Sequence, residues 1–451
     1  MDAGGGYESY EVGVGQASQA DWWDWVLKTT ILLALGLLIF ISIRLQAFYP
    51  LVRVEEARGL DAILFRPSVL WFMMGSILLL FRTLLWFTYK PVPLASMEDA
   101  PRLSVVIPAY NEGPMVAKSI DSIVAARYPA DRLEIFVVDD GSRDDTWTHI
   151  EQAVARHGAR VRALRHTVNL GKREALASGF RKATGDVFVT VDSDSVVSKD
   201  ALLGLAGPFA NPRVGVVAGK VLVYNQRAGL IPRMLYVRFM LAFDFIRAYQ
   251  STFGTVYCSP GALSAYRASA VRQVMDKWLH QTFLGVRATI GEDRAMTNDV
   301  MRLGYDSVYQ SNATVLTLVP TRYRQLCKMF LRWNRSYIRE EVRLLRVLPH
   351  RPLVPRLMAI FDCSVTNLRY PVLALAMMLL ALEVAYHPLT LPRLLVSMGL
   401  VSSLYSLYYL RSERSLQFVY GIVFEYFSFF LMFWIFPWAF LTVRAKGWLT
   451  R

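Results

Sequence analysis

The segment GDVFVTVDSDS, residues 185–195, joins a short β-rich apolar run to two carboxylates that are one residue apart, Asp192 and Asp194. Valine and phenylalanine in this run favour a strand that ends where the acidic residues begin. Two carboxylates at the end of a strand offer hard oxygen ligands to a divalent cation, which can in turn hold a sugar-nucleotide diphosphate. Because Asp and Ser are also ordinary turn residues, a solvated turn is the alternative interpretation of this segment taken alone.

The chain before this segment alternates between predicted strands and predicted helices. Apolar runs predict strands at LSVVIPAY, LEIFVVDDG and VRALRH, and helices are predicted at Met115–Ala126, Thr146–His157 and Arg173–Ala183. Strands separated by helices of this length predict a parallel α/β sheet with right-handed crossovers. Ligands of such sheets bind at the carboxyl ends of the strands. We therefore expect the polar tips at 109–112, 139–142 and 192–194 to meet at one ligand.

The two ends of the chain have the composition of a membrane protein. Hydrophobic residues make up 54% of the sequence and charged residues only 19%, and the deficit of charge is concentrated at the ends. Apolar stretches long enough to span a membrane predict helices at Trp25–Tyr49, Ser68–Tyr89, Met358–Tyr386, Leu389–Leu410 and Phe418–Leu441. Glu425 and Pro437 interrupt the last stretch, which we expect to be re-entrant, interfacial or split into two short passes. We expect the first apolar segment to be retained rather than cleaved as a signal peptide.

This reading divides the chain into five parts. They are a disordered N-terminus (1–24), two transmembrane helices (25–90), a cytoplasmic α/β catalytic domain (91–320), interfacial helices (321–355) and a C-terminal transmembrane or channel region (356–451). The composition of Leu230–Tyr249 fits an interfacial helix and a core helix equally well. The basic, aromatic segment Tyr323–Arg346 predicts a helix that lies under the cytoplasmic lipid headgroups.

The net charge of +14 fits a protein at an anionic membrane surface that binds a diphosphate, and no motif indicates nucleic acid. We therefore expect membrane lipid, and no nucleic acid, among the partners. The three cysteines have no metal-binding spacing, which suits a reducing cytoplasm.

Seven motifs follow one another along the chain: VVIPAYNEG, VVDDGSRDDT, NLGKREAL, VDSDS, CSPGALSAYR, GEDRAMTNDV and LRWNRSYIRE. In this order they resemble the processive family 2 membrane glycosyltransferases, namely hyaluronan synthases, NodC-type chitin oligosaccharide synthases and chitin synthases. The resemblance extends from Leu103 to the C-terminus. It implies a GT-A (Rossmann-like) catalytic domain inserted between transmembrane helices, a UDP-sugar donor and Mg²⁺ or Mn²⁺.

The resemblance also implies roles for individual residues. Tyr110 and Glu112 correspond to uridine contacts, Asp140 to a contact with the base or ribose, and Lys172 and Arg173 to basic nucleotide contacts; turns and a solvated helix start are the alternatives. Asp192 and Asp194 would hold the metal, with Asp194 the better candidate and Asp192 also near the donor. In GED, Glu292 and Asp293 are the catalytic candidates, and we expect Asp293 to be the general base. An N-terminal helix cap is the alternative interpretation of either carboxylate.

The acceptor site is implied by two further motifs. Arg332 and Trp333 match the end of the family's Gln-x-x-Arg-Trp motif, in which Arg can pair with a diphosphate and Trp can stack on a sugar. The position of the Gln is Met329, a departure that bears on the substrate. Cys258 and Ser259 are candidates for lining the acceptor site, with a buried structural cysteine as the alternative. The loop that holds them has the length of the chitin synthase form.

These observations predict an inverting, metal-dependent enzyme that extends a β-linked, N-acetylglucosamine-containing polysaccharide, hyaluronan in the most specific version. UDP-N-acetylglucosamine would be a donor and UDP-glucuronic acid a second one, and the growing polysaccharide would cross the cell (inner) membrane. A chitin-type synthase, a non-processive transferase and a nucleotide-binding transport component without catalysis are the alternatives. Ionisable residues in the expected spans would line the channel or form structural pairs: Arg82, Asp362, Arg369, Glu383 and Glu425.

Overall fold

The structure is a computed structural model that describes residues 33, 40, 67–386, 388 and 390–445. Apart from residues 33 and 40, the expected N-terminal segment and first span lie outside these residues, as does the end of the C-terminal tail. The helices are α3 (Pro67–Thr88), α4 (Met115–Val124), α5 (Thr146–His157), α6 (Lys172–Lys182), α7 (Ala201–Ala206), α8 (Leu230–Leu241), α9 (Ala248–Thr252), α10 (Ala268–Leu279), α11 (Glu292–Arg302), α12 (Tyr323–Leu344), α13 (Leu353–Tyr386), α14 (Thr390–Glu413), α15 (Val419–Leu431) and α16 (Ile435–Leu441). A π-helical segment, η7 (Ala242–Arg247), joins α8 to α9.

Within these residues the main sheet has eight strands in the order β3-β2-β1-β4-β7-β6-β10-β5. The strands are β1 (Leu103–Ala109), β2 (Leu133–Asp139), β3 (Val161–Arg165), β4 (Val187–Val191), β5 (Ser195–Val197), β6 (Val214–Val223), β7 (Leu263–Arg267) and β10 (Asp306–Thr317), while β8 (Thr282–Phe283) and β9 (Val286–Arg287) form a small hairpin. The first four strands are parallel, as predicted. The sheet as a whole is mixed, because β7 runs antiparallel to both β4 and β6.

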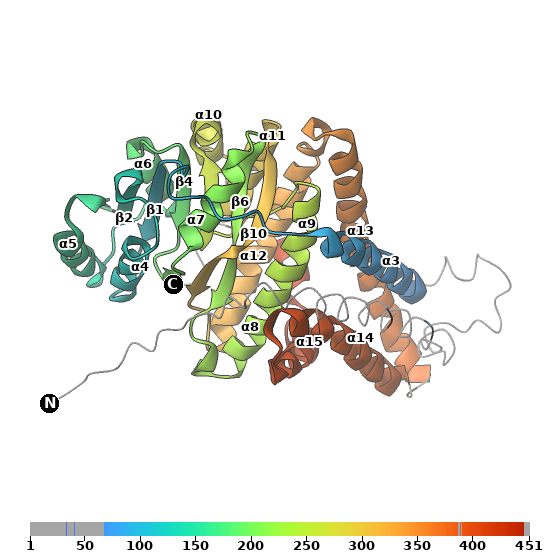
Figure 1. Cartoon of the computed structure of the whole chain (residues 1–451). Helices are drawn as coiled ribbons and strands as arrows, with labels where there is room; N and C mark the ends of the chain where they lie inside the picture. Colours follow the sequence, from blue (N-terminus) through green and yellow to red (C-terminus); the bar gives the residue numbers. More distant parts are fainter. Residues whose placement is uncertain (1–32, 34–39, 41–66, 387, 389, 446–451) are drawn as a thin grey trace.

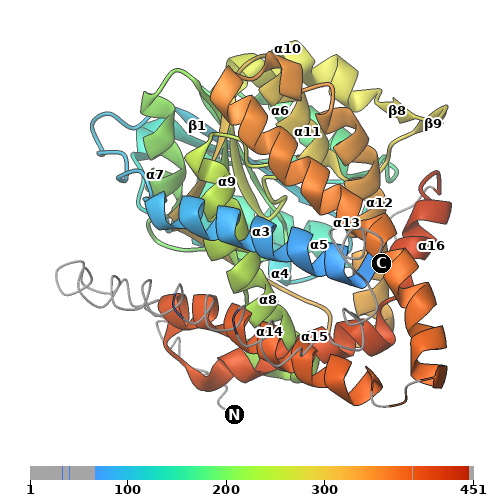
Figure 2. The ribbon, with the colours of Figure 1, turned by 90° about the vertical axis from the view of Figure 1, so that its right-hand side faces the viewer.

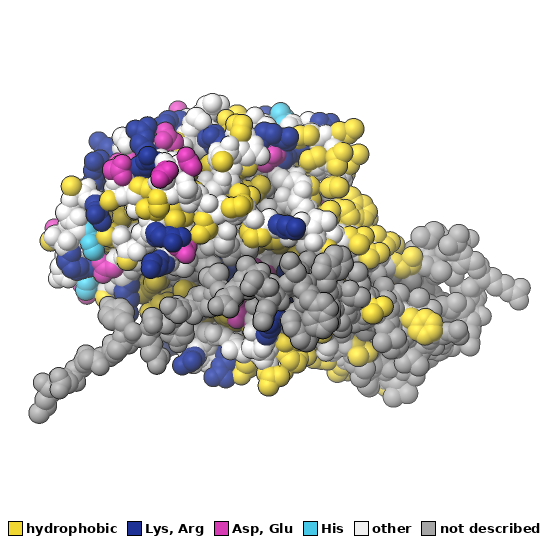
Figure 3. Space-filling model, viewed as in Figure 1, with side chains coloured by type: hydrophobic (Ala, Val, Ile, Leu, Met, Phe, Trp, Pro, Cys, Tyr) yellow, Lys and Arg dark blue, Asp and Glu magenta, His cyan; other side chains and the backbone are white. Residues whose placement is uncertain are grey.

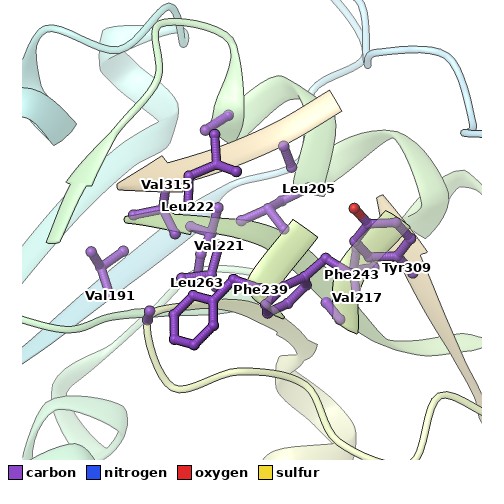
Figure 4. Packing of buried hydrophobic residues seen from close by; sticks show 14 of the residues in the cluster. Val191, Leu205, Val217, Val221, Leu222, Phe239, Phe243, Leu263, Tyr309 and Val315 are labelled. Atoms are coloured by element: carbon purple, nitrogen blue, oxygen red, sulfur yellow. The ribbon is translucent and has the colours of Figure 1, made fainter. Parts of the chain in front are cut away.

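Helices cover both faces of this sheet (Figure 1). Successive residues of β1 point to opposite faces, so Val105 packs in the larger core on one side and Val106 in the smaller core on the other. Helices α4, α5, α7 and α8 contribute to the larger core, and α6, α10 and α11 to the smaller one. Figure 4 shows Phe239 and Phe243 lying against sheet residues of the larger core, among them Val217 and Leu263. The segment 230–249 is therefore a core helix on this side of the sheet.

Two helices of the described part are long and apolar enough to cross a membrane, within α3 (Leu70–Thr88) and as α13 (Leu353–Tyr386). They coincide with the second and third predicted spans. The last predicted span is broken, because α15 (as Leu416–Leu431) and α16 are bent by 52° and qualify only as one broken span or a re-entrant loop. The fourth predicted span is helical, as α14, but is not apolar enough to qualify as a membrane-crossing helix. Figure 2 shows α14 and α15 beneath the catalytic domain, and Figure 3 shows apolar side chains gathered on the side of α13.

Two of the ionisable residues predicted within the spans form a buried pair rather than facing lipid. Arg82 of α3 donates to Asp362 of α13 at 2.8 Å and to Thr366 of the same helix at 2.6 Å. Tyr249 of α9 donates to the same Asp362 carboxylate at 3.0 Å. These contacts tie both membrane-type helices to the catalytic domain.

Candidate active site

The three polar tips predicted at strand ends lie side by side, because β2, β1 and β4 are neighbours in the sheet. The turn after β1 is fastened to the turn after β2: the Asn111 amide donates to Ser142 Oγ at 3.0 Å, and the Glu112 amide donates to Thr146 Oγ1 at 2.8 Å. Asn111 adopts a positive φ of 54°, a conformation that asparagine tolerates better than most residues. These bonds hold the half-buried side chains of Tyr110 and Glu112 at this edge.

Asp140 is buried and organises the loop that leads into α6. Its carboxylate accepts hydrogen bonds from the amides of Leu170 at 2.9 Å and Gly171 at 2.8 Å, and it contacts His166 Nδ1 at 2.8 Å. The same loop presses on Gly141, where a Cβ would lie 2.6 Å from the carbonyl carbon of Val168. Asp140, which was predicted to contact the base or ribose, thus holds the backbone of the loop before α6 in place.

Lys172, the first residue of α6, stands at the centre of the carboxylate cluster. Its ammonium lies 2.5 Å from Asp192 Oδ1 and 2.9 Å from Glu292 Oε1. Burial opposes the positive charge, but Asp192 and Glu292 outweigh burial and raise the pKa of Lys172. The loop before β7 closes over this pair, since a Cβ on Gly261 would lie 2.8 Å from Lys172 Nζ.

Arg173 follows Lys172 in sequence but does not join this cluster. Neighbouring residues on a helix point about 100° apart, and Arg173 is buried under α10, where it donates to the carbonyl of Trp278 and stacks on its ring. Burial lowers the pKa of Arg173 to about 10. The structure therefore gives the two predicted nucleotide contacts different surroundings.

Glu292 and Asp293 occupy the first turn of α11 and have opposite electrostatic settings. Burial would raise the pKa of Glu292, but the adjacent Lys172 prevails and lowers it to about 2. Burial, followed by the negative charge of Glu292, raises the pKa of Asp293 above its usual value. A carboxylate with a raised pKa is a better proton acceptor, so the arrangement suits Asp293 as base and Glu292 as the counter-ion of Lys172.

Helix α12 brings Arg332 to the same cluster. Gly291, with a φ of 74°, lies directly against α12, because a Cβ there would approach within 1.9 Å of Ser336 Oγ. Arg332 precedes Ser336 by four residues and shares its helix face. Burial lowers the pKa of Arg332 against the attraction of four carboxylates: Glu292, Asp192, Asp293 and Asp194. The guanidinium thus lies where a diphosphate would need a counter-charge.

The predicted acceptor residues have different surroundings, and one of them, Cys258, contacts Asp293. Trp333 is 40% exposed and packs against Phe239 and Phe330, which leaves part of the indole open to a sugar. Cys258 Sγ lies 4.0 Å from Asp293 Oδ2, and burial raises the pKa of this thiol to about 11. Ser259 is buried and bonded to Tyr266 and Thr297, so its hydroxyl supports the loop from behind.

Met329, at the position of the family's Gln, is buried in the larger core. The amide group of a Gln side chain at this position would need hydrogen-bond partners away from solvent. Met329, which replaces the Gln, needs none and is accommodated by apolar packing.

The donor set at the end of β4 fits a divalent cation that shares its ligands with a substrate. Asp192 and Asp194 are both half-buried, and Asp194 Oδ1 accepts from Thr317 Oγ1 at 3.2 Å. Within the described part of the chain, no group of three or more His, Cys, Asp or Glu side chains could hold a metal. Two carboxylates are sufficient for Mg²⁺ or Mn²⁺ when phosphate oxygens complete the shell.

Comparison with known proteins covers the strand-built part of this cluster, whereas Glu292, Asp293 and Arg332 lie beyond the residues matched by the family model. Residues 104–275 match the family model "Glycosyl transferase family 2". Over these residues the chain is similar to glycosyltransferases of family 2. The resemblance inferred from the motifs is confirmed at that level.

The chain is 36% identical over 258 residues to a hyaluronan synthase of Streptococcus pyogenes, a match that covers 56% of this chain and 61% of that protein. It is 34% identical over 251 residues to an N-acetylglucosaminyltransferase of Rhizobium sp. strain N33, covering 55% of each. The match thus spans little more than half the length of these relatives. A mannosyltransferase from Pyrobaculum calidifontis, solved with GDP-Man and Mn²⁺, superposes with a TM-score of 0.56 at 21% identity, over 80% of this chain and 99% of that one. The shared architecture is the GT-A fold predicted from the motifs.

Three residues that reach the site were not predicted from the sequence. Arg294 pairs with Glu341 of α12 at 3.0 Å, behind Asp293. Gly261 was visible only as part of the CSPG motif, and its close approach to Lys172 depends on tertiary packing. Arg247 lies within the segment 230–249, predicted as an interfacial or core helix, and it donates to the carbonyl of Cys258.

Proposed function

We propose that this protein is an inverting, metal-dependent, processive glycosyltransferase. It elongates a β-linked, N-acetylglucosamine-containing polysaccharide of the hyaluronan type from UDP-sugars and moves the product across the membrane. The observation that carries the proposal is the cluster in which Asp293, a half-buried carboxylate with a raised pKa, lines the same small cavity as Lys172, the partner of Asp192.

The residues of this cluster can supply a base for the acceptor hydroxyl and positive charge for the departing diphosphate. Asp293 removes the proton from the acceptor hydroxyl while that oxygen forms a bond to the anomeric carbon and the bond from this carbon to the diphosphate breaks. Lys172 and Arg332 attract the negative charge that develops on the departing diphosphate. A divalent cation held by Asp192 and Asp194 would neutralise part of the same charge. In this proposal Glu292 serves as the counter-ion of Lys172, and a single displacement by the acceptor oxygen inverts the anomeric centre.

The membrane role is proposed from the helices that surround the domain. Helix α3 precedes the catalytic domain and α13 follows it, and both are long and apolar enough to span a bilayer. We assign a multi-pass protein of the cell membrane with the catalytic domain on the cytoplasmic side, where UDP-sugars are made. The cationic excess of +14 favours contact with anionic lipid.

The relatives support the donor assignment. One is named a hyaluronan synthase and another an N-acetylglucosaminyltransferase. The second name indicates transfer of N-acetylglucosamine, for which we propose UDP-N-acetylglucosamine as the donor, and UDP-glucuronic acid is the second donor of the hyaluronan version. A chitin-type synthase needs the first donor alone.

Release of UDP from purified, detergent-solubilised protein tests this proposal, with each donor alone and with both, in Mg²⁺ or Mn²⁺. Turnover that requires both donors and yields a hyaluronidase-sensitive polymer establishes the hyaluronan version. Turnover with UDP-N-acetylglucosamine alone indicates a chitin-type synthase if the product is long, or a single-sugar transferase if it is short. UDP binding without turnover for any donor would leave the transport component as the better account.

A further inference from the structure

A π-helical turn, η7, lies between the membrane-type helices and the active site. Such turns are rare, insert one extra residue into a helix and occur mostly where a side chain is redirected for function. Here the turn covers Ala242–Arg247 and ends with a half-buried arginine. Its position in the larger core can be followed from Phe239 and Phe243 in Figure 4.

The turn is fixed on one side by Asp244. This carboxylate pairs with Lys220 of β6 at 2.7 Å and accepts from the hydroxyl of Tyr309 of β10 at 2.8 Å. The backbone carbonyl of Asp244 accepts from the indole of Trp86 in α3 at 2.6 Å. The start of the turn is therefore attached both to the sheet and to a membrane-type helix.

The segment is fixed again just after the turn. Tyr249 bonds Asp362 of α13, the carboxylate that also pairs with Arg82 of α3. Arg247 lies between these two attachments, so its backbone has little freedom to move relative to α3, α13 or the sheet.

Arg247 uses this fixed position to hold the loop at 258–261. Its Nε donates to the carbonyl of Cys258 at 3.0 Å, its Nη1 donates to the carbonyl of Ala242 at 3.1 Å, and its guanidinium stacks 4.0 Å from the centre of the Phe243 ring. Among the described residues it forms no ion pair with a carboxylate. Burying part of a cation without an acidic partner is costly, and the planar guanidinium of Arg247 instead donates to two backbone carbonyls.

The loop that Arg247 holds borders the reacting groups on both sides. At one end Cys258 lies beside Asp293, and at the other Gly261 lies against Lys172 and Asp192. A shift of this loop would change the space between the base and the donor cluster at once, and misplacement of about 1 Å can cost about a hundredfold in rate.

We infer that Arg247 is a positioning residue that ties the acceptor loop 258–261 to the membrane-type helices α3 and α13. It acts on transfer to the acceptor more than on donor binding: Gly261 of the loop lies against the donor cluster, but the side chains of Lys172, Asp192 and Asp140 are carried by other elements. The inference rests on the proposed glycosyltransferase function and extends it to a residue outside the family motifs.

The test compares Arg247→Gln and Arg247→Lys with the wild type as full-length protein in detergent. The readouts are polymer formed from UDP-N-acetylglucosamine with UDP-glucuronic acid, UDP affinity by calorimetry and the melting temperature. We expect polymer formation to fall about tenfold to a hundredfold in Arg247→Gln with UDP affinity unchanged. Arg247→Lys should not rescue it, because an ammonium cannot reproduce a planar fork on two carbonyls and a ring.

Two further variants make the result decisive. Phe243→Leu removes the stacked ring and should lower polymer formation to a smaller extent, and it decides the question if Arg247→Gln does not fold. Arg302→Gln, on the exposed end of α11, should leave every readout unchanged. Polymer formation at the wild-type rate in Arg247→Gln, full rescue by lysine, or a loss of UDP affinity in step with polymer would overturn the inference. A wild type that makes no polymer with any donor would instead refute the proposed function.

Discussion

The two sides of the active site hold their charged groups in different ways. At the edge formed by β1, β2 and β4, the buried carboxylate of Asp140 is satisfied chiefly by the backbone amides of Leu170 and Gly171. Where α11 meets α12 and α6, side chains satisfy one another, as in Lys172–Glu292 and Arg294–Glu341. A backbone donor survives every substitution except one by proline, whereas a side-chain partner can be removed by many substitutions. The second region should therefore be the more sensitive to single changes.

The helix-built region also contains a buried network that sets the position of α12. Glu340 of α12 is fully buried and accepts hydrogen bonds from three side chains. The donors are Gln281 in the segment after α10, Asn298 in α11, and Arg343 in α12 itself. Removing one member of such a network leaves another charge uncompensated. Arg332 and Asp293 are carried by the two helices that the network joins, so their relative position depends on it.

The largest expected effect concerns the base. Asp293→Asn removes the proton acceptor while keeping the size of the side chain, and transfer should fall roughly 10²- to 10⁴-fold. UDP affinity should persist, since Lys172 and the strand-end turns are untouched. UDP release and calorimetry with UDP measure the two quantities. Asp276→Asn, on the exposed face of α10, is the control, and equal activity of both variants would exclude Asp293 as the base.

The next effect separates stability from catalysis within the same cluster. Lys172→Met leaves Glu292 buried beside Asp293 without its cation, which should cost roughly 3–5 kcal/mol of stability. The double variant Lys172→Met/Glu292→Gln should recover much of the melting temperature, because the uncompensated charge is gone. It should not recover UDP release, because the diphosphate loses its ammonium. Recovery of both properties would mean that Lys172 is purely structural.

Much of the strand-built region could be predicted from the sequence, because its signals are local. The strands at 103–109, 133–139 and 161–165 and helix α5 follow from apolar runs and the turn residues between them. The antiparallel β7 was not predicted, since its neighbours β4 and β6 are far away in sequence and pairing direction leaves no local pattern.

The helix-built region was predicted as a set of residues without its arrangement. The motifs named Asp293 and Arg332, but their meeting depends on the contact of Gly291 with Ser336, a packing fact that neither segment reveals alone. The direction of Arg173, in contrast, could have been predicted locally. Had the helix been predicted to start directly after Gly171, helix geometry would have indicated that Arg173 points away from Lys172.

A smaller effect is expected at the acceptor side. Trp333→Ala removes the half-open indole between Phe239 and Phe330, and loss of an aromatic contact of this kind costs about 0.5–1.5 kcal/mol. Products should become shorter, and donor hydrolysis should remain. Trp333→Phe keeps an aromatic face and should be milder. Unchanged product length in Trp333→Ala, measured on a gel, would remove this residue from the acceptor site.

The finest comparison within the sensitive region is that between Glu292 and Asp293. The pKa of Glu292 is lowered to about 2, so this residue stays ionised at the pH values at which enzymes are assayed. Asp293 must be ionised to act as base. We therefore expect the loss of activity at low pH, the acid limb of the pH profile, to report protonation of Asp293. Burial and the charge of Glu292 both raise the pKa of Asp293, so activity should be lost on acidification earlier than for an ordinary aspartate.

Removing one of these two causes gives the sign of the test. In Glu292→Gln the negative neighbour is gone and Lys172 acts on Asp293 with less opposition, so the pKa of Asp293 falls and the acid limb of kcat/KM moves to lower pH. Glu151→Gln, exposed on α5, should leave the limb in place. A limb that stays put or moves to higher pH in Glu292→Gln would show that Glu292 does not set the proton affinity of the base. Its contribution would then be confined to holding Lys172.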